Sequence, residues 1–243
     1  MTEASDDIEE DSRRLARIAG GLYLVVTVAA LFGEVVVRGK LLRLGDPAVT
    51  ATNILSHQSL YRLGAAADLI AFMADAALAV VLLGLFEHAS RLLSLAMAVF
   101  RLGHAVIAAA NTLNYLAPLV LLAGTGAVAS AGAASDADLA ILFLRMHANG
   151  YNVALMFFGV HCVLLGVLIG RSGLIPKVLG ALIGVAGACY LANSIAAFVA
   201  PTLKAAIYPA VLIPAGLAEW ALMLWLLLGR VKVSGLALAS RAA

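Results

Sequence analysis

The fold is decided by YRLGAAADLIAFMADAALAVVLLGLF (residues 61–86) and LLSLAMAVFRLGHAVIAAANTLNYL (residues 92–116), two apolar stretches joined by the short polar segment 87–91. Each stretch exceeds the roughly 20 residues that an α-helix needs to cross a bilayer. Each also holds side chains that lipid disfavours, namely Asp68, Asp75, Arg101, His104, Asn111 and Asn114. Because a charge at mid-bilayer costs about 2.5–3.5 kcal/mol, the two stretches predict a membrane hairpin whose polar residues have a partner or a purpose.

The composition of the whole chain agrees with a membrane protein. Hydrophobic residues make up 63% and charged residues 12% of the 243 residues, and the mean hydropathy is +1.02. A soluble domain is nearer half apolar and a quarter charged. The net charge of +2 gives no reason to expect nucleic acid as a partner. The lipid bilayer is therefore the expected surrounding, and Cys162 and Cys189, both inside apolar runs, are interpreted as small core residues.

Further apolar runs of the same kind predict an all-α polytopic bundle of six transmembrane helices. The spans are expected at residues 18–37, 61–86, 92–116, 139–169, 175–199 and 208–228. The fourth run is longer than a bilayer requires. Its helix either projects into water at its start or bends near Gly150, and we favour a projecting helix that enters the bilayer near His147.

Capping residues and glycines give further local expectations. Asp46 before Pro47 predicts a short interfacial helix in the first outer loop, and Ser56 is expected to cap the second span. The third span is expected to end before Pro118, after which Leu119–Leu122 can finish it. Ser135 is expected to begin the fourth helix with acidic residues in its first turn. The fifth span carries small residues at a spacing that lets helix backbones approach closely in lipid, namely Gly180, Gly184 and Gly187.

The chain divides into a transmembrane domain, residues 15–230, and two tails. Residues 1–14 are expected to form an acidic cytoplasmic tail and residues 231–243 a loose cytoplasmic tail, and a flexible loop is expected at 123–135. With both termini inside, the inner segments carry nine basic residues and the outer segments six. Short cytoplasmic loops are enriched in Lys and Arg, so this orientation is favoured.

The polar residues inside the spans predict a pocket that opens to the outer face. In the hairpin, residues level with each other have numbers that sum to about 178, which puts Asp75 level with Arg101 and Asp68 level with Asn111. Asp75 and Arg101 are expected to form an ion pair, since buried charges need partners. The candidate pocket residues are Asp68, Asp75, Arg101, His104, Asn111, His147, His161 and Glu219. Their spacings match no metal-binding motif, so no metal is assigned to the pocket, and no catalytic residue or cofactor is identified.

Several short motifs together resemble one known family. They are Arg17-Ile-Ala-Gly-Gly-Leu-Tyr, Asp46 with Thr50 and Asn53-Ile54, Arg62, Phe100-Arg101-Leu102, His147, Phe157-Phe158-Gly159-x-His161, Arg171-Ser-Gly-Leu-Ile-Pro-Lys-Val-Leu-Gly180, and Glu219 with Trp225-Leu-Leu. The chain resembles the uncharacterised bacterial family known as domain of unknown function 4386 over about residues 13–230. The resemblance implies a multi-pass protein of the bacterial inner membrane, and it brings no activity or site residue with it.

Three classes of function stay open at this point. The first is binding or transport of a small molecule or lipid through the outward pocket, because an intramembrane charge is by default a functional hypothesis. The second is an intramembrane enzyme acting on a lipid, with Asp68 or Glu219 as general base and a histidine as general acid. The third is a structural or partner-binding membrane protein whose charges only hold the bundle together. The ligand and the oligomeric state are not determined by the sequence.

Overall fold

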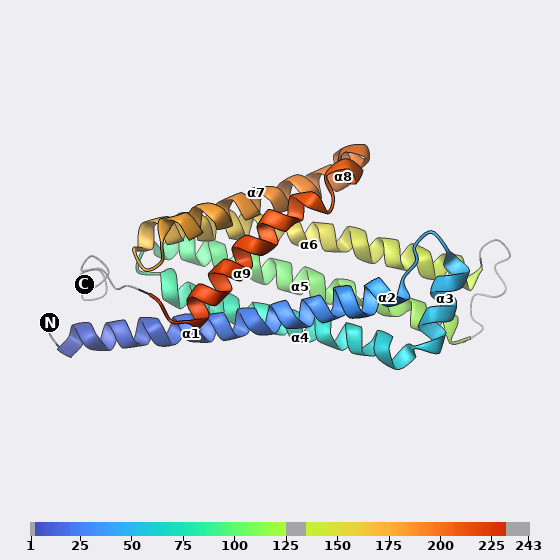
Figure 1. Ribbon diagram of the computed structural model, residues 1–243, viewed down its shortest axis with the longest axis horizontal. Helices are drawn as coiled ribbons and strands as arrows, with labels where there is room; N and C mark the ends of the chain where they lie inside the picture. Colours follow the sequence, from blue (N-terminus) through green and yellow to red (C-terminus); the bar gives the residue numbers. More distant parts are fainter. Residues whose placement is uncertain (1–2, 125–134, 232–243) are drawn as a thin grey trace. The chain divides into compact units, whose positions relative to one another are not determined.

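Six helices in the described part of the chain are long and apolar enough to cross a membrane, in agreement with the six predicted spans. The computed structural model describes residues 3–124 and 135–231, which contain helices and no strands (Figure 1). The elements are α1 (Glu3–Leu31), the π-helix η1 (Phe32–Arg38), α2 (Gly39–Leu41), α3 (Pro47–Ser56), α4 (Gln58–Phe86), α5 (Arg91–Leu122), α6 (Asp136–Ser172), α7 (Lys177–Val199), α8 (Pro201–Ile207), η2 (Ala210–Leu212) and α9 (Ile213–Leu227). The predicted all-α membrane bundle is therefore confirmed as a fold class.

The local signals for helix ends mostly hold. The Asp46 side chain accepts a hydrogen bond from the Val49 backbone N–H at 3.0 Å, with Pro47 at the first position of α3. At the start of α6, the Ser135 hydroxyl accepts from the Asp138 backbone N–H at 3.2 Å, while the Ser135 backbone N–H donates to the Asp138 carboxylate at 3.3 Å. This reciprocal pair is a capping box, and it satisfies backbone donors that a helix start otherwise leaves free.

Other boundaries differ from the expectation. Ser56 is the last residue of α3 and not a cap of α4. α5 continues through Pro118 to Leu122, which a membrane helix tolerates because other groups can satisfy the freed backbone carbonyl. The first span extends to Leu41, so Arg38 belongs to the helix and not to the loop after it. Most of the loop expected at 123–135 and of the tail expected at 231–243 lies outside the described residues.

α6 is one helix of 37 residues from Asp136 to Ser172. At a rise of 1.5 Å per residue it is about 55 Å long, against about 30 Å for the hydrocarbon core of a bilayer. The helix is therefore long enough to project from the hydrocarbon at an end, as favoured from the sequence.

The chain separates into two compact units. The first unit comprises Met1–Leu24, Ala74–Ala105 and Asn152–Ala243, and the second comprises Val25–Met73 and Val106–Tyr151. The first unit has a mainly aliphatic core to which α1, α4, α5, α6, α7 and α9 contribute, including Leu82, Leu165, Ile183 and Leu226. The second unit has a smaller core, built from Val37, Leu41, Ile54, Tyr61, Ala65, Tyr115, Leu119, Ile141 and Leu144.

Glycines bring α6 and α7 of the first unit into close contact. A Cβ added at Gly187 would lie 2.6 Å from the Gly159 carbonyl oxygen, and one at Gly180 would lie 2.8 Å from the Gly166 carbonyl oxygen. Both distances are shorter than a van der Waals contact, so only glycine fits. The predicted close approach of the fifth span is confirmed at Gly180 and Gly187, whereas a Cβ at Gly184 would meet nothing within 4 Å.

One face of α5 is exposed and entirely apolar. Its large side chains recur every seven residues with exposures of 76%, 56%, 66%, 73% and 62%, at Leu92, Val99, Val106, Leu113 and Val120. A seven-residue spacing keeps side chains on one face of a helix. A contiguous exposed apolar stripe of this length is unusual for a soluble protein and is suited to contact with lipid.

Candidate functional site

A buried ion pair joins α4 and α5 in the first unit. The Arg101 Nη2 donates to the Asp75 Oδ1 at 2.5 Å, and the two side chains are 0% and 3% exposed. The hydroxyl of Ser94, on α5, donates at 3.0 Å to the backbone carbonyl of Leu83, on α4, which gives nearly the same register. The ion pair predicted from the level positions of Asp75 and Arg101 is therefore present.

Arg101 has further partners from two other helices. Its Nη1 donates to the Tyr23 hydroxyl at 3.0 Å and contacts the His161 Nε2 at 2.7 Å. The guanidinium carbon lies 4.7 Å from the centroid of the Tyr23 ring and 5.3 Å from that of Phe158, within the range of a cation–π contact. Because Arg has no acceptor, the Nε2 of His161 must accept.

The same geometry assigns the protonation of His161. Its Nδ1 lies 3.0 Å from the Met97 carbonyl oxygen, which can only accept. The proton of a neutral imidazole is therefore on Nδ1. His161 is thus a neutral acceptor for Arg101 and does not add a second positive charge beside it.

Asp75 and Arg101 are joined by a single hydrogen bond, between Nη2 and Oδ1. Asp75 Oδ2 and Arg101 Nε are fully buried and have no hydrogen-bond partner among the residues that the structure describes. Leaving a buried polar group unpaired costs several kcal/mol in a lipid environment. The pair therefore presents one free acceptor and one free donor inside the first unit.

The ring of Phe158 connects this pair to a second carboxylate. Its centroid lies 4.8 Å from the His104 ring and 5.3 Å from the Tyr190 ring, which meets it edge-on. The Tyr190 hydroxyl donates to the Glu219 carboxylate. We call this set the Arg101 cluster: Tyr23, Asp75, Arg101, His104, Phe158, His161, Tyr190 and Glu219. All six spans contribute to it.

The second unit contains an ion pair of a different kind. Arg38 donates from Nη1 to Asp68 Oδ2 at 2.6 Å and from Nη2 to Asp68 Oδ1 at 3.1 Å, and from Nε to Glu34 Oε2 at 2.7 Å. Both oxygens of Asp68 are thus occupied. Arg38 and Glu34 belong to the π-helix η1, and a Cβ at Gly33 would lie 2.6 Å from Asp68 Oδ1. Glycine at this position allows the pair to form.

Polar contacts beside this pair join α4, α5 and α6 of the second unit. The rings of Tyr61 and Tyr115 stack with centroids 4.3 Å apart, and the Tyr61 hydroxyl donates to the Tyr115 backbone carbonyl. The Asn111 side-chain amide donates to the His147 carbonyl oxygen at 2.8 Å. A Cβ at Gly150 would clash with this amide, so the glycine admits Asn111 to the α6 backbone.

The predicted pocket residues thus fall into two groups. The first unit brings together Asp75, Arg101, His104, His161 and Glu219, and the second unit holds Asp68, Asn111 and His147. The contact of Asp68 is with Arg38, and that of Asn111 is with His147. A single cavity shared by all eight stays a prediction.

Several residues of these networks were not among the candidates from the sequence, and three of them, Tyr23, Tyr190 and Arg38, carry polar groups that contact a predicted residue. Tyr23 and Tyr190 carry hydroxyls in apolar helices, and a buried hydroxyl normally has a hydrogen-bond partner. Their positions inside spans therefore indicated that each contacts a polar group of another helix. Arg38 was assigned to a loop. Its spacing of four residues from Glu34 is a helical ion-pair spacing and could have extended the first span.

A metal site is not formed by these groups. Among residues 3–124 and 135–231, no three His, Cys, Asp or Glu side chains lie close enough together to hold a metal ion. The chemistry that the Arg101 cluster offers is hydrogen bonding through Asp75 Oδ2 and Arg101 Nε, together with aromatic ring faces.

One family model matches the chain. It has the description Domain of unknown function (DUF4386) and covers residues 18–229. No curated protein and no solved structure matches the chain. The matched range includes every residue of the Arg101 cluster and the Arg38–Asp68 pair.

Proposed function

Since the chain belongs to the family described as Domain of unknown function (DUF4386), we propose a function from its own residues: it binds a small polar molecule inside the membrane, at the Arg101 cluster. The observation that supports this is the Asp75–Arg101 pair, which is fully buried and leaves Asp75 Oδ2 and Arg101 Nε without partners in the described residues. A ligand that carries both a donor and an acceptor, such as a hydroxyl, an amide or a carboxylic acid, would satisfy both atoms.

A comparison with the Arg38–Asp68 pair of the second unit supports the choice of the Asp75–Arg101 pair. Arg38 binds both oxygens of Asp68 and uses its Nε for Glu34, so that pair has no free hydrogen-bonding atom at its contact. A two-point contact is the usual geometry of an Arg–carboxylate pair. Asp75 makes a one-point contact with Arg101, through Oδ1 only. A bound polar group at Oδ2 would explain this difference. Transport of the same molecule through the predicted outward pocket is part of the proposal.

A structural role is the second candidate. Arg101 joins α1, α4 and α6 through Tyr23, Asp75 and His161 and lies over two aromatic rings. Such a node could hold the helices of the first unit together without binding anything. Buried ion pairs often contribute little net stability, so a purely structural node should be replaceable by neutral residues.

The test compares two neutral double variants. Asp75→Asn with Arg101→Gln removes both charges of the cluster at similar size, and Asp68→Asn with Arg38→Gln does the same in the second unit. Small molecules that co-purify with the folded proteins are identified by mass spectrometry. A compound retained by the wild type and the second-unit variant and lost from the cluster variant would support binding. The same compounds in all three proteins would indicate a structural role.

We also propose the cellular setting: a bacterial inner membrane, with both termini in the cytoplasm. The support is the excess of basic residues in the segments assigned to the inside. Arg38 follows the first expected span and is one of the six outer basic residues. Its side chain is bound in the Asp68 pair and is 16% exposed. Removing it from the outer count strengthens the same orientation.

A further inference from the structure

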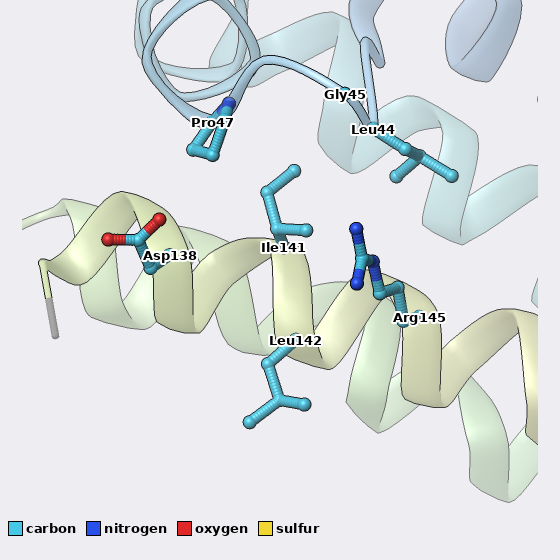
Figure 2. Close-up of a pocket in the computed structure, with 7 residues that line it drawn as sticks. All are labelled: Leu44, Gly45, Pro47, Asp138, Ile141, Leu142 and Arg145. Carbon is cyan, nitrogen blue, oxygen red and sulfur yellow. The ribbon is translucent and has the colours of Figure 1, made fainter.

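The second unit contains a cavity, and neither Arg38 nor Asp68 lines it. It has a volume of about 250 Å³ and is lined on one side by Leu44, Gly45 and Pro47. The α6 helix forms the other side with Asp138, Ile141, Leu142 and Arg145 (Figure 2). Drug-sized ligands occupy roughly 300–1,000 Å³, so this cavity suits a small polar group and not a whole lipid.

The walls of the cavity are firmly held. The Thr50 hydroxyl donates to the Arg43 carbonyl oxygen at 2.8 Å and accepts from the Arg43 backbone N–H at 2.9 Å. The Asn53 side-chain amide donates to the Leu41 carbonyl oxygen at 3.1 Å. These bonds tie the loop between α2 and α3 to α3, and Ile141 is buried in the core of the second unit. Hydrogen bonds on one side and core packing on the other therefore fix the shape of the cavity.

Arg145 supplies a cation at this cavity. It is exposed and forms no ion pair or hydrogen bond with any residue in the described ranges. In Figure 2 its guanidinium points toward Leu44 and Gly45. A guanidinium can bind two oxygens of a carboxylate or of a phosphate at once, and beside a bilayer the phosphate of a lipid headgroup is such a ligand.

Asp138 supplies an anion at the same cavity. It lies seven residues before Arg145, on the same face of α6, and Ile141 stands between the two charges in Figure 2. One carboxylate oxygen, Oδ2, accepts from Ser135, and Oδ1 appears in no such bond among the described residues. The two charges thus stand apart, each able to bind the opposite charge of a zwitterion.

The length of α6 favours a position of the cavity among lipid headgroups. Asp138 and Arg145 lie in the first ten residues of α6, which at about 55 Å exceeds the hydrocarbon core of about 30 Å. Large apolar side chains are exposed beside the cavity, including Leu142 at 51% and Met146 at 46%. A ligand with a polar head in the cavity would lay its apolar part against these side chains.

From this arrangement we propose that the cavity binds the headgroup of a zwitterionic phospholipid, with the phosphate on Arg145 and a primary ammonium on Asp138. Phosphatidylethanolamine has both groups, and its ammonium can donate to Asp138 Oδ1. Phosphatidylglycerol has the phosphate but no ammonium. The site is independent of the Arg101 cluster, so it stands whether or not that cluster binds a ligand.

The first experiment measures lipid retention by native mass spectrometry. The full chain is placed in nanodiscs of equal parts phosphatidylethanolamine and phosphatidylglycerol and released from them in the mass spectrometer. The wild type should retain more phosphatidylethanolamine than phosphatidylglycerol. Arg145→Gln should lower its retention about tenfold, as expected for loss of one charge-assisted hydrogen bond. Asp138→Asn, which keeps an oxygen for the Ser135 cap, should remove the preference between the two lipids.

The matched control is Arg62→Gln, which removes an exposed arginine of the second unit that does not line the cavity. It should retain lipid as the wild type does. Equal retention by Arg145→Gln and the wild type, or no lipid preference in the wild type, would overturn the proposal. A thermal-shift titration compares phosphatidylethanolamine with soluble phosphoethanolamine, and so distinguishes a lipid headgroup from a soluble compound as the ligand. Protection by the lipid alone supports a lipid site, and equal protection by the soluble compound refutes it.

Discussion

At the scale of single residues, the two Asp–Arg pairs differ in how each carboxylate is used. Asp68 gives both oxygens to Arg38. Asp75 gives one oxygen to Arg101, whose other contacts are the neutral groups of Tyr23 and His161. Asp75 is therefore the only negatively charged group that forms a hydrogen bond with Arg101 in the described residues. The stability of the protein with Arg101 buried should depend on Asp75.

This dependence predicts strong coupling between Asp75 and Arg101. Asp75→Leu leaves an arginine that cannot lose its proton, whereas Arg101→Leu leaves a carboxylate that can gain one. Loss of one partner from a buried pair costs on the order of 3–5 kcal/mol, so Asp75→Leu should be the more destabilising single change. The double variant should be more stable than Asp75→Leu alone, as measured by thermal unfolding in detergent.

A pair without contact provides the control for this cycle. Arg171 is exposed at the end of α6, so Asp75→Leu with Arg171→Leu should destabilise by the sum of the two single changes, as distant sites normally do. If Asp75 with Arg101 is equally additive, the contact between α4 and α5 described above does not exist in the membrane.

At the scale of helices, glycine contacts decide how closely α6 and α7 pack. Gly180→Ala and Gly166→Ala would place a methyl group 2.8 Å and 2.6 Å from a backbone oxygen of the other helix. Forcing extra atoms into a packed contact costs about 1–3 kcal/mol. Both variants should therefore unfold at a lower temperature than the wild type.

Gly184 is the matched control on the same helix. A Cβ there meets nothing within 4 Å, and alanine is favoured over glycine in a helix by roughly 0.5–1 kcal/mol. Gly184→Ala should leave the unfolding temperature unchanged or raise it. A loss of stability as large as that of Gly180→Ala would show that the helices meet through a different face.

At the scale of the whole molecule, the proposed orientation can be tested with single cysteines in a background of Cys162→Ala and Cys189→Ala. Thr50 is buried, whereas its neighbour Thr52 is exposed on α3, and Glu87 is exposed between α4 and α5. Thr52→Cys should react with an impermeant thiol reagent on intact cells, and Glu87→Cys should react only after lysis. Reaction at Glu87→Cys alone would invert the orientation.

The sequence by itself determined the class of fold and much of its local structure. Six apolar runs became six helices, because a bilayer requires about 20 apolar residues for each crossing. The Asp46 cap and the Ser135 capping box followed from short-range chemistry. The Asp75–Arg101 contact was also predicted, because a short loop fixes the register of an antiparallel hairpin and opposite charges in lipid need each other.

Only the tertiary structure decided which faces of the helices are exposed and which pack against protein. The exposed stripe of α5 and the buried core of the first unit are equally apolar, since lipid tails and protein interiors select the same side chains. Hydropathy therefore cannot separate the two faces. The partner of Asp68 was hidden for a related reason, because Arg38 follows an apolar run and resembles a loop residue until η1 places it beside Asp68. The contacts that distinguish the two Asp–Arg pairs depend on helices distant in sequence, and no local pattern encodes them.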